Sequence, residues 1–416
     1  MIPLLLLSLA VHADRLTLPQ ALAQARAVNA TLPLARADVA NAEAKAKEAR
    51  AGLYPHLSLE AEVQVGRPGA YADSHALAKV LAATTLFDAG RRRSALRASL
   101  AELRAASQGL RQADADLALE VRLRFDELTA LDEEQAVRAQ ALERLQGYLS
   151  LLEGRRAGGQ GGGADALKTR ARLTQDAAEL EGLARARGDA AQAFNDLIGR
   201  DPAQPLVLAP WSALELEAAP ELRTATPEGA EPPELAQAKA RVESLQAQRD
   251  AASADRLPRL DARAELGGIK PMFGSGLAAN DVATAPGEGF GAAVGLSLSW
   301  PVWDFGELNA RVAQAQAGVE KARAQVQLAA RDARLKRSLA QSDARSLARE
   351  LALRREAEPL AKDAYLSTES LYRGGVGSAL EVLDAYGAWV DASVKTLTTR
   401  AALRDARARL LRWEGR

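Results

Sequence analysis

Hydrophobic and polar residues alternate along two pairs of short segments, one pair in each half of the chain. In the first half the alternation covers about 57–66 and 77–87, and in the second half about 259–267 and 290–302. A period of two residues predicts strands, because successive side chains of a strand point to opposite faces. Each segment has about ten residues, the length that a tilted strand needs to cross a bilayer. The pattern therefore predicts four strands, each with an apolar and a polar face.

Apolar residues recur every three or four positions after each pair of strands, which predicts two long helices. These cover about 89–156 and 305–373, and each follows an aspartate suited to cap it, Asp88 or Asp304. At about 1.5 Å per residue, each helix would extend roughly 100 Å. Pro359 lies inside the second run and is expected to kink or break it.

Glycine-rich breaks end both long helices and reverse the chain into return helices, expected over about 165–199 and 378–414. The first break superficially resembles a phosphate-binding loop, but it follows a helix and lacks the Gly-Lys-Ser/Thr ending. Both breaks are therefore interpreted as hairpin turns. Their turn residues are Gly158 and Gly159 in the first half and Gly374, Gly375 and Gly377 in the second.

The same order of elements occurs twice. Asp88-Ala89-Gly90 and Asp304-Phe305-Gly306 open the long helices 216 residues apart, and the glycine breaks keep the same spacing. A repeat of this size indicates a tandem duplication. We predict a mainly α fold with a small β part, in which a helix–strand–strand–long helix–helix unit spans 14–200 and again 234–416. A linker rich in proline and alanine, 201–233, joins the two repeats.

Composition narrows the class of protein. Only 4% of residues are aromatic while 26% are charged, which favours long helices packed side by side over a conventional globular core. The 54 basic and 54 acidic residues cancel, so no overall field attracts nucleic acid. Residues 1–13 form an apolar run that ends in a small-x-small site, which predicts a secretory signal peptide. No later stretch is long and apolar enough for a transmembrane helix.

No enzyme site stands out. The chain has no cysteine, three histidines and two methionines, which disfavours a metal site. No Gly-x-Ser-x-Gly elbow or pair of catalytic carboxylates occurs. We therefore expect no catalytic residues, no cofactor and no bound metal.

Two groups of residues have both a structural and a functional interpretation. Phe87, Trp300 and Trp303 lie where strand gives way to helix, and they either pack in a core or form an aromatic girdle at a membrane boundary, which we favour. Glu381 and Asp384 are three residues apart on one helix face, where solvated charge is the default. Around a three-fold axis the same pair would become six carboxylates that select cations.

The strands also allow two interpretations. They could be amphipathic strands on a soluble core, but no face of bulky residues is available to cover them. Four strands cannot close a barrel, so with the apolar face outward they would need strands from other copies of the chain.

The ordered repeats resemble the TolC-like outer membrane efflux family over nearly the whole chain after residue 13. The most specific match is 372–385, similar to the family's Tyr-x-x-Gly-x-x-x-x-x-acid-Val-Leu-acid-Ala segment, with a degenerate first-repeat copy at Asp165-Ala166-Leu167. The resemblance implies an acidic constriction at Glu381 and Asp384, with Tyr372 among the contacts that hold it shut. The best-known member has an arginine of this lock where this chain has Gly377, so the resemblance leaves the residues of the lock open.

The resemblance further implies a homotrimer, with a trimeric α-barrel across the periplasm joined to a 12-stranded β-barrel among the lipids of the outer membrane of a Gram-negative bacterium. A periplasmic adaptor protein and an inner-membrane transporter are the implied partners, for drug efflux, metal efflux or type I protein secretion. Two other classes stay open: a periplasmic coiled-coil adaptor, and an extracytoplasmic scaffold of coiled coils. Neither needs two equal repeats with alternating strand pairs.

Overall fold

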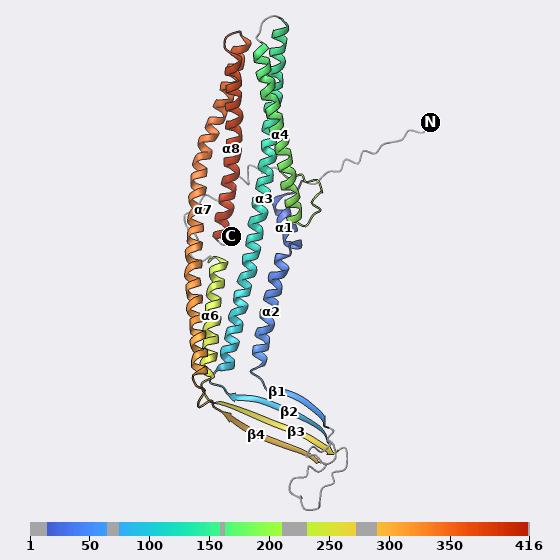
Figure 1. Cartoon of the computed structure of the whole chain (residues 1–416), viewed down its shortest axis with the longest axis vertical. Coiled ribbons are helices and arrows are strands. Elements are labelled where there is room, and N and C mark those ends of the chain that lie inside the picture. Colours follow the sequence, from blue (N-terminus) through green and yellow to red (C-terminus); the bar gives the residue numbers. More distant parts are fainter. Residues whose placement is uncertain (1–14, 65–74, 159–162, 210–230, 272–288, 415–416) are drawn as a thin grey trace, which may run out of the picture. The chain divides into compact units, whose positions relative to one another are not determined.

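The computed structural model describes residues 15–64, 75–158, 163–209, 231–271 and 289–414. The expected signal peptide, residue Gly159 and most of the expected linker lie outside the described residues. Figure 1 shows the described part as long helices and one four-stranded sheet. The expected mainly α fold with a small β part is confirmed.

The helices and strands follow the repeated order. In the first repeat they are α1 (Leu18–Val28), α2 (Thr31–Ala51), β1 (His56–Gln64), β2 (His75–Phe87), α3 (Arg91–Ala157) and α4 (Gly163–Leu197). In the second repeat they are α6 (Pro233–Ala254), β3 (Arg259–Pro271), β4 (Gly289–Ser299), α7 (Glu307–Arg373) and α8 (Ala379–Trp413). Within the described residues, no helix combines the length and the hydrophobicity that a membrane span requires.

Three elements differ from the sequence prediction, and the first is strand β3, which extends to Pro271 and not to about residue 267. Strand β4 ends at Ser299 and not near residue 302, because Pro301 has no N–H to continue a ladder. The expected break at Pro359 is wrong, since α7 is one continuous helix from Glu307 to Arg373. Leu351 and Tyr365 are buried on either side of the proline, and this packing holds the helix across the missing hydrogen bond.

The described chain divides into two compact units, and each draws on both repeats. The strand unit comprises Ala35–Leu110 and Pro233–Ala330, and the helical unit comprises Met1–Leu34, Arg111–Pro232 and Arg331–Arg416. Helices α3 and α7 contribute residues to both units.

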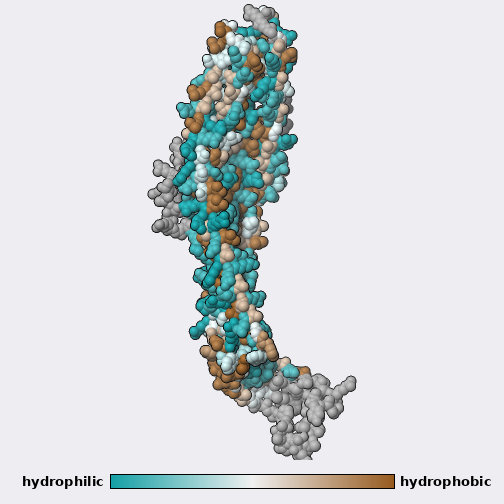
Figure 2. Space-filling view, turned by 60° about the vertical axis from the view of Figure 1, so that its left-hand side comes forward, coloured by the Kyte–Doolittle hydropathy of each residue, from teal (hydrophilic) through white to brown (hydrophobic). Residues whose placement is uncertain are grey.

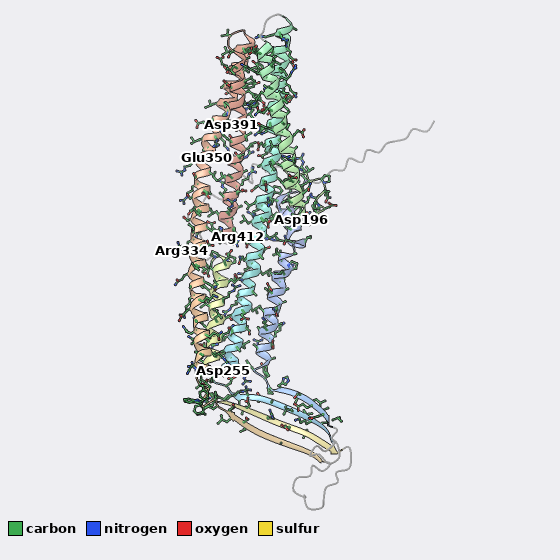
Figure 3. The ribbon with its side chains drawn as sticks, viewed as in Figure 1. Asp196, Asp255, Arg334, Glu350, Asp391 and Arg412 are labelled. Carbon is green, nitrogen blue, oxygen red and sulfur yellow. The ribbon has the colours of Figure 1, made fainter. Side chains whose placement is uncertain are left out.

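The strand unit contains an antiparallel sheet in the order β1-β2-β3-β4. The central pair joins the repeats, because β2 of the first pairs with β3 of the second. Charged residues link the adjacent helices: Arg104 of α3 lies 2.6 Å from Glu243 of α6, and Arg91 lies 2.9 Å from Asp255, which Figure 3 labels.

The helical unit is built around buried residues that α3, α4, α7 and α8 share. Its N-terminal segment is tied to the start of the expected linker, because Leu16 forms a parallel bridge with Leu208. Arg26 of α1 also forms two hydrogen bonds of 2.7 and 2.8 Å to Asp114 of α3. Residues 201–209 therefore belong to the packed surface of this unit.

Candidate functional site

The sheet has one apolar face. Leu57, Val294 and Leu296 are 71%, 84% and 69% exposed, although each would be expected in a core. The strand register places these residues on one side, in rows such as Leu59, Val80 and Leu266. The large exposed apolar residues of this face are Leu57, Leu59, Val63, Val80, Leu266, Val294, Leu296 and Leu298. A soluble protein rarely exposes such a continuous patch, so this face requires an apolar environment.

The other face of the sheet is polar, and its charges are paired. Lys79 of β2 lies 2.9 Å from Glu60 of β1. On β3, Asp261 accepts a 2.6 Å hydrogen bond from the Thr85 hydroxyl and pairs with Arg259 at 2.9 Å. A cavity of about 740 Å³ opens on this side near the ends of α2 and β2. The alternation of apolar and polar residues that the sequence predicted therefore gives the sheet one apolar and one polar face.

The turn from strand to long helix has the same geometry in both repeats. The Asp88 carboxylate accepts from the amides of Gly90 and Arg92, at 3.1 and 3.0 Å. Asp304 accepts in the same way from Gly306 and Leu308, at 3.0 and 2.7 Å. The middle residues Ala89 and Phe305 both have positive φ, 50° and 51°, which side chains other than glycine rarely adopt.

These hydrogen bonds act on the acidity of the two aspartates. Burial raises the pKa of Asp88, but the amide and guanidinium of Arg92 outweigh it, and the pKa lies below its usual range. The amides of Leu308 and Gly306 likewise lower the pKa of Asp304. Both caps are therefore carboxylates at neutral pH.

The predicted boundary aromatics are exposed beside these turns. Phe87, Trp300 and Trp303 are 53%, 57% and 78% exposed, which excludes core packing within this chain. The Trp300 indole donates to the Arg256 carbonyl at 3.2 Å. Sequence reasoning missed a fourth member, Phe305, which is 93% exposed and meets Trp303 edge to face at 5.7 Å. Its place in the Asp-x-Gly turn was the available signal.

The turn at the end of α7 is defined by backbone bonds. Val376 donates to the Leu371 carbonyl and Gly375 to the Tyr372 carbonyl, both at 3.0 Å, which forms a Schellman motif. Gly375 and Gly377 have φ of 83° and 114°. A side chain at Gly377 would be strained at this φ, which is a conformation that glycine favours.

The predicted constriction residues do not gather at one point. Glu381 and Asp384 are exposed on the first turns of α8, whereas Tyr372 is buried at the end of α7. Glu381 also has a structural role, because it completes a capping box with Ser378. The Ser-x-x-Glu spacing is a sequence signature of this motif, and sequence reasoning missed it.

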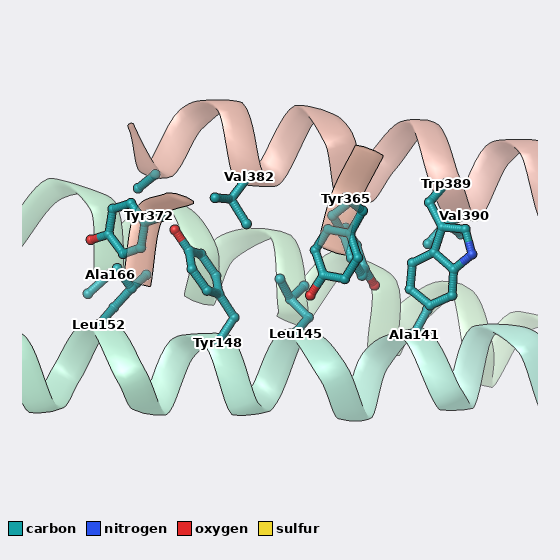
Figure 4. Packing of buried hydrophobic residues seen from close by; sticks show 12 residues of the cluster. Ala141, Leu145, Tyr148, Leu152, Ala166, Tyr365, Tyr372, Val382, Trp389 and Val390 are labelled. Atoms are coloured by element: carbon teal, nitrogen blue, oxygen red, sulfur yellow. The ribbon is translucent and has the colours of Figure 1, made fainter. Parts of the chain in front are cut away.

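Tyr372 belongs to an aromatic cluster that joins the two helix hairpins (Figure 4). It meets Tyr148 of α3 edge to face at 5.5 Å, while Tyr365 of α7 stacks on Trp389 of α8 at 5.4 Å. Tyr386 of α8 donates a 2.9 Å hydrogen bond to Asp176 of α4. Burial raises the pKa of Tyr365 to about 12, so its hydroxyl stays neutral at physiological pH.

Arg155 is the second functional candidate that sequence reasoning missed. Its guanidinium lies 4.9 Å from the centre of the Tyr372 ring and donates to the carbonyls of Tyr372 and Arg373, at 2.9 and 2.6 Å. A cation there also complements the negative end of the α7 dipole. Arg155 lies 217 residues from Tyr372, and no local pattern relates such distant positions.

Solved structures share the fold of this chain. The outer-membrane channel OprN covers 96% of this chain and 89% of its own, with a TM-score of 0.79 and 23% identity. VceC of Vibrio cholerae covers 96% of both chains, with a TM-score of 0.79 and 19% identity. The open state of the MtrE outer membrane channel of Neisseria gonorrhoeae covers 96% and 88%, with a TM-score of 0.77 and 19% identity. The fold is that of outer membrane channels.

Among curated protein sequences, none matches this chain. The outer membrane efflux protein family matches residues 21–200 and 229–416. The chain belongs to the outer membrane efflux protein family. This is a class of channels and not of enzymes, and it confirms the outer membrane as the location.

Proposed function

We propose that three copies of the chain form one conduit, with twelve strands in the outer membrane and long paired helices in the periplasm. The two-faced sheet carries this proposal. A four-stranded sheet cannot close by itself, and open strand edges are not tolerated in hydrocarbon. Pairing of β1 with β4 of a neighbouring copy would remove both edges, turn the apolar face to lipid and leave the polar face toward water.

The mass and conductance of the purified protein test this. In detergent, light scattering should give a complex of three chains, and the same sample should form discrete conducting pores in planar bilayers. A stable monomer that needs no detergent would contradict the proposal.

The conduit would work with two partners, a periplasmic adaptor protein and an inner-membrane transporter that selects the cargo. Family membership supports this arrangement, because an outer membrane channel has no energy source of its own. Cross-linking in intact cells followed by affinity purification should recover both partners with the chain. Recovery of the chain alone under these conditions would contradict it.

Glu381 and Asp384 would line the constriction at the tip. Both are exposed on one face of α8, while Val382 and Tyr386 on the other face are buried. Three copies would gather six carboxylates around the axis, which would favour cations and bind multivalent ones. The proposed role of this pair thus follows from three-fold symmetry.

The test removes charge and keeps the fold. Glu381→Gln preserves the capping box, because glutamine also serves at the third helical position. Combined with Asp384→Asn, it should lower cation selectivity and weaken block by multivalent cations. The control Asp391→Asn neutralises another exposed carboxylate of α8 and should leave both properties unchanged. Unaltered selectivity in the double variant would reject the constriction.

Tyr372 would act as part of the closed state through Arg155, which ties the end of α7 to α3. Arg155→Met keeps an aliphatic chain over the Tyr372 ring but removes the donors to two carbonyls. The variant should raise the open probability in bilayer recordings, whereas Arg156→Met, at the exposed neighbour, should not. Equal behaviour of the two variants would show that Arg155 only stabilises the turn.

The exposed aromatics Phe87, Trp300, Trp303 and Phe305 would lie at the lipid–water boundary, where amphipathic rings are favoured. Lipids brominated near the headgroup should quench tryptophan fluorescence more strongly in the parent than in Trp300→Phe/Trp303→Phe. Equal quenching in both would place these rings away from lipid.

A further inference from the structure

Exposed apolar side chains extend beyond the end of the sheet. Trp300 directly follows β4 and continues, in a step of two residues, the apolar row of Leu296 and Leu298. Figure 2 shows hydrophobic side chains gathered at the end of the long helices next to the sheet. In this part of the second repeat, five apolar side chains are each more than half exposed, and we call them the turn patch: Leu257, Trp300, Val302, Trp303 and Phe305.

Arg256 lies beside the turn patch. Its carbonyl accepts a hydrogen bond of 3.2 Å from the Trp300 indole, and Leu257 is its neighbour in the chain. The backbone amides at the start of α7 lower the pKa of Asp304 most, and the nearby charge of Arg256 adds to this lowering. The guanidinium of Arg256 therefore lies near the strand–helix turn, next to exposed aromatic rings.

The carboxylates around Arg256 are already bound. Asp304 accepts from the two amides that cap α7. Asp255 lies 2.9 Å from a guanidinium of α3, and Glu307 lies 2.7 Å from Arg311. Arg256 differs, because its guanidinium forms no ion pair with any other residue that the structure describes. A cation with unused donors is thus left at the edge of an apolar surface.

The groups left without a partner decide which ligand fits. A guanidinium donates hydrogen bonds in a planar fork that matches the oxygens of a phosphate. A zwitterionic headgroup also carries an ammonium, which needs an acceptor, and the neighbouring carboxylates are already bound. An anionic phospholipid brings the phosphate without the ammonium, and the turn patch offers apolar surface to the first carbons of its acyl chains.

We propose that Arg256 and the turn patch bind one anionic phospholipid of the phosphatidylglycerol class, with the guanidinium on the headgroup phosphate. The lipid belongs to the periplasmic leaflet, because the sheet ends here and the long helices begin. The site requires the proposed position of the exposed aromatics at the lipid–water boundary, on which it rests, and adds the class of lipid that is bound there.

The first repeat has a different residue at the position of the arginine. Counted from the proline that precedes the first strand of each repeat, Leu53 stands where Arg256 stands in the second repeat. Ala89 likewise stands 216 residues before Phe305. The duplicated chain therefore provides one such site, and the proposed trimer provides three.

Fluorescence quenching in vesicles measures the preference, because the strand unit has two tryptophans, Trp300 and Trp303. The protein is reconstituted in equal parts of phosphatidylglycerol and phosphatidylethanolamine, with bromine near the headgroup of one lipid at a time. One basic side chain near an anionic membrane surface favours binding about five-fold. The parent should therefore prefer phosphatidylglycerol over phosphatidylethanolamine by about that factor.

Two matched variants assign the preference to Arg256. Arg256→Gln removes the charge and keeps a polar side chain, so it should bring the ratio of the two lipids close to one. Quenching with both lipids brominated should stay at the parental level, because the tryptophans keep their place. The control Arg323→Gln neutralises another exposed arginine, about 24 Å along α7 from Glu307, and should keep the parental preference. An equal loss in both variants would show a general effect of charge and overturn the site.

Three further results would overturn the site, and they can be told apart from a failure of the proposed conduit. Equal quenching by the two lipids in the parent would reject the site, while a three-chain mass by light scattering would leave the conduit intact. A preference that is lost in inorganic phosphate but kept in sodium chloride of the same ionic strength would assign Arg256 to free phosphate ions. Quenching by neither lipid would remove the proposed boundary position of the aromatics as well as the site.

Discussion

The two turns that lead from strand to long helix share one backbone and have different side-chain surroundings. In the first repeat Arg92 pairs with Asp88 at 2.9 Å and donates to the carbonyls of Gly52 and Thr85, which ties α2, β2 and α3 together. In the second repeat Leu308 occupies the equivalent position, and the turn instead exposes Phe305 beside Trp303. The backbone of the turn is therefore the same in both repeats. In the first repeat Arg92, here called the clamp, holds three elements together, and in the second repeat the turn forms an exposed aromatic surface.

The largest effect should come from removing the clamp. Arg92→Leu, which copies the second repeat, leaves Asp88 without its guanidinium and two carbonyls without a donor. Unsatisfied partners of this kind cost about 1–3 kcal/mol, and we expect a loss in that range for the strand unit. Thermal unfolding followed by circular dichroism measures it. Arg93→Leu, at the exposed neighbour, should stay within about 0.5 kcal/mol; an equal loss there would contradict the clamp.

Removal of each capping aspartate should show a further difference between the two turns. Asp88→Ala should destabilise the start of α3 by about 1–2 kcal/mol, since it loses a helix cap and the partner of Arg92. Asp304→Ala loses the cap alone and should have the smaller effect. Hydrogen exchange of the amides of Arg92 and Leu308 reports each turn directly. Faster exchange at Leu308 in Asp304→Ala than at Arg92 in Asp88→Ala would reverse the comparison.

Acid should weaken both caps. The pKa of each aspartate is lowered in the folded chain, so its contribution is complete above the usual aspartate pKa of about 4 and is lost as pH falls through the lower folded value. The exchange of the Arg92 and Leu308 amides should accelerate below about pH 4 beyond the intrinsic chemical trend. Asp88→Asn and Asp304→Asn should remove the extra acceleration at their own turn only.

The smallest effect on stability should come from replacing the middle residues of the two turns, Ala89 and Phe305, which have positive φ. Ala89→Gly relieves a positive φ and changes stability by no more than about 1 kcal/mol, because glycine also gains freedom in the unfolded chain. Phe305→Gly relieves the same strain but deletes the exposed ring, so it should also reduce binding to lipid vesicles when the urea-unfolded protein is diluted into them. A vesicle-binding loss as large in Ala89→Gly would show that the backbone, and not the ring, matters.

Local patterns predicted most of the fold. The period of two located every strand to within a few residues, apart from the ends of β3 and β4, because alternation is written in neighbouring residues. The Asp-x-Gly pairs predicted both helix starts for the same reason. The prediction of a break at Pro359 was wrong. The cost of one missing backbone hydrogen bond is outweighed by the packing of buried residues on both sides of the proline.

The candidate site could be predicted only in part. The exposure of Glu381 and Asp384 followed from their spacing, and the Ser378 capping box was readable but missed. Arg155 and Tyr372 could not be paired from the sequence, because their contact depends on how two hairpins pack. The positive φ of Phe305 is likewise a property of the folded turn, although its glycine neighbour marks the place.

The central claim is that the apolar face of the sheet contacts lipid and the polar face contacts water. A chain without cysteine allows single spin labels to be placed along β4 in membrane-reconstituted protein. Labels at 294, 296 and 298 should be relaxed mainly by oxygen, which concentrates in lipid, and labels at 293, 295 and 297 mainly by a water-soluble nickel chelate. Equal access of the nickel chelate to all six positions would contradict the account.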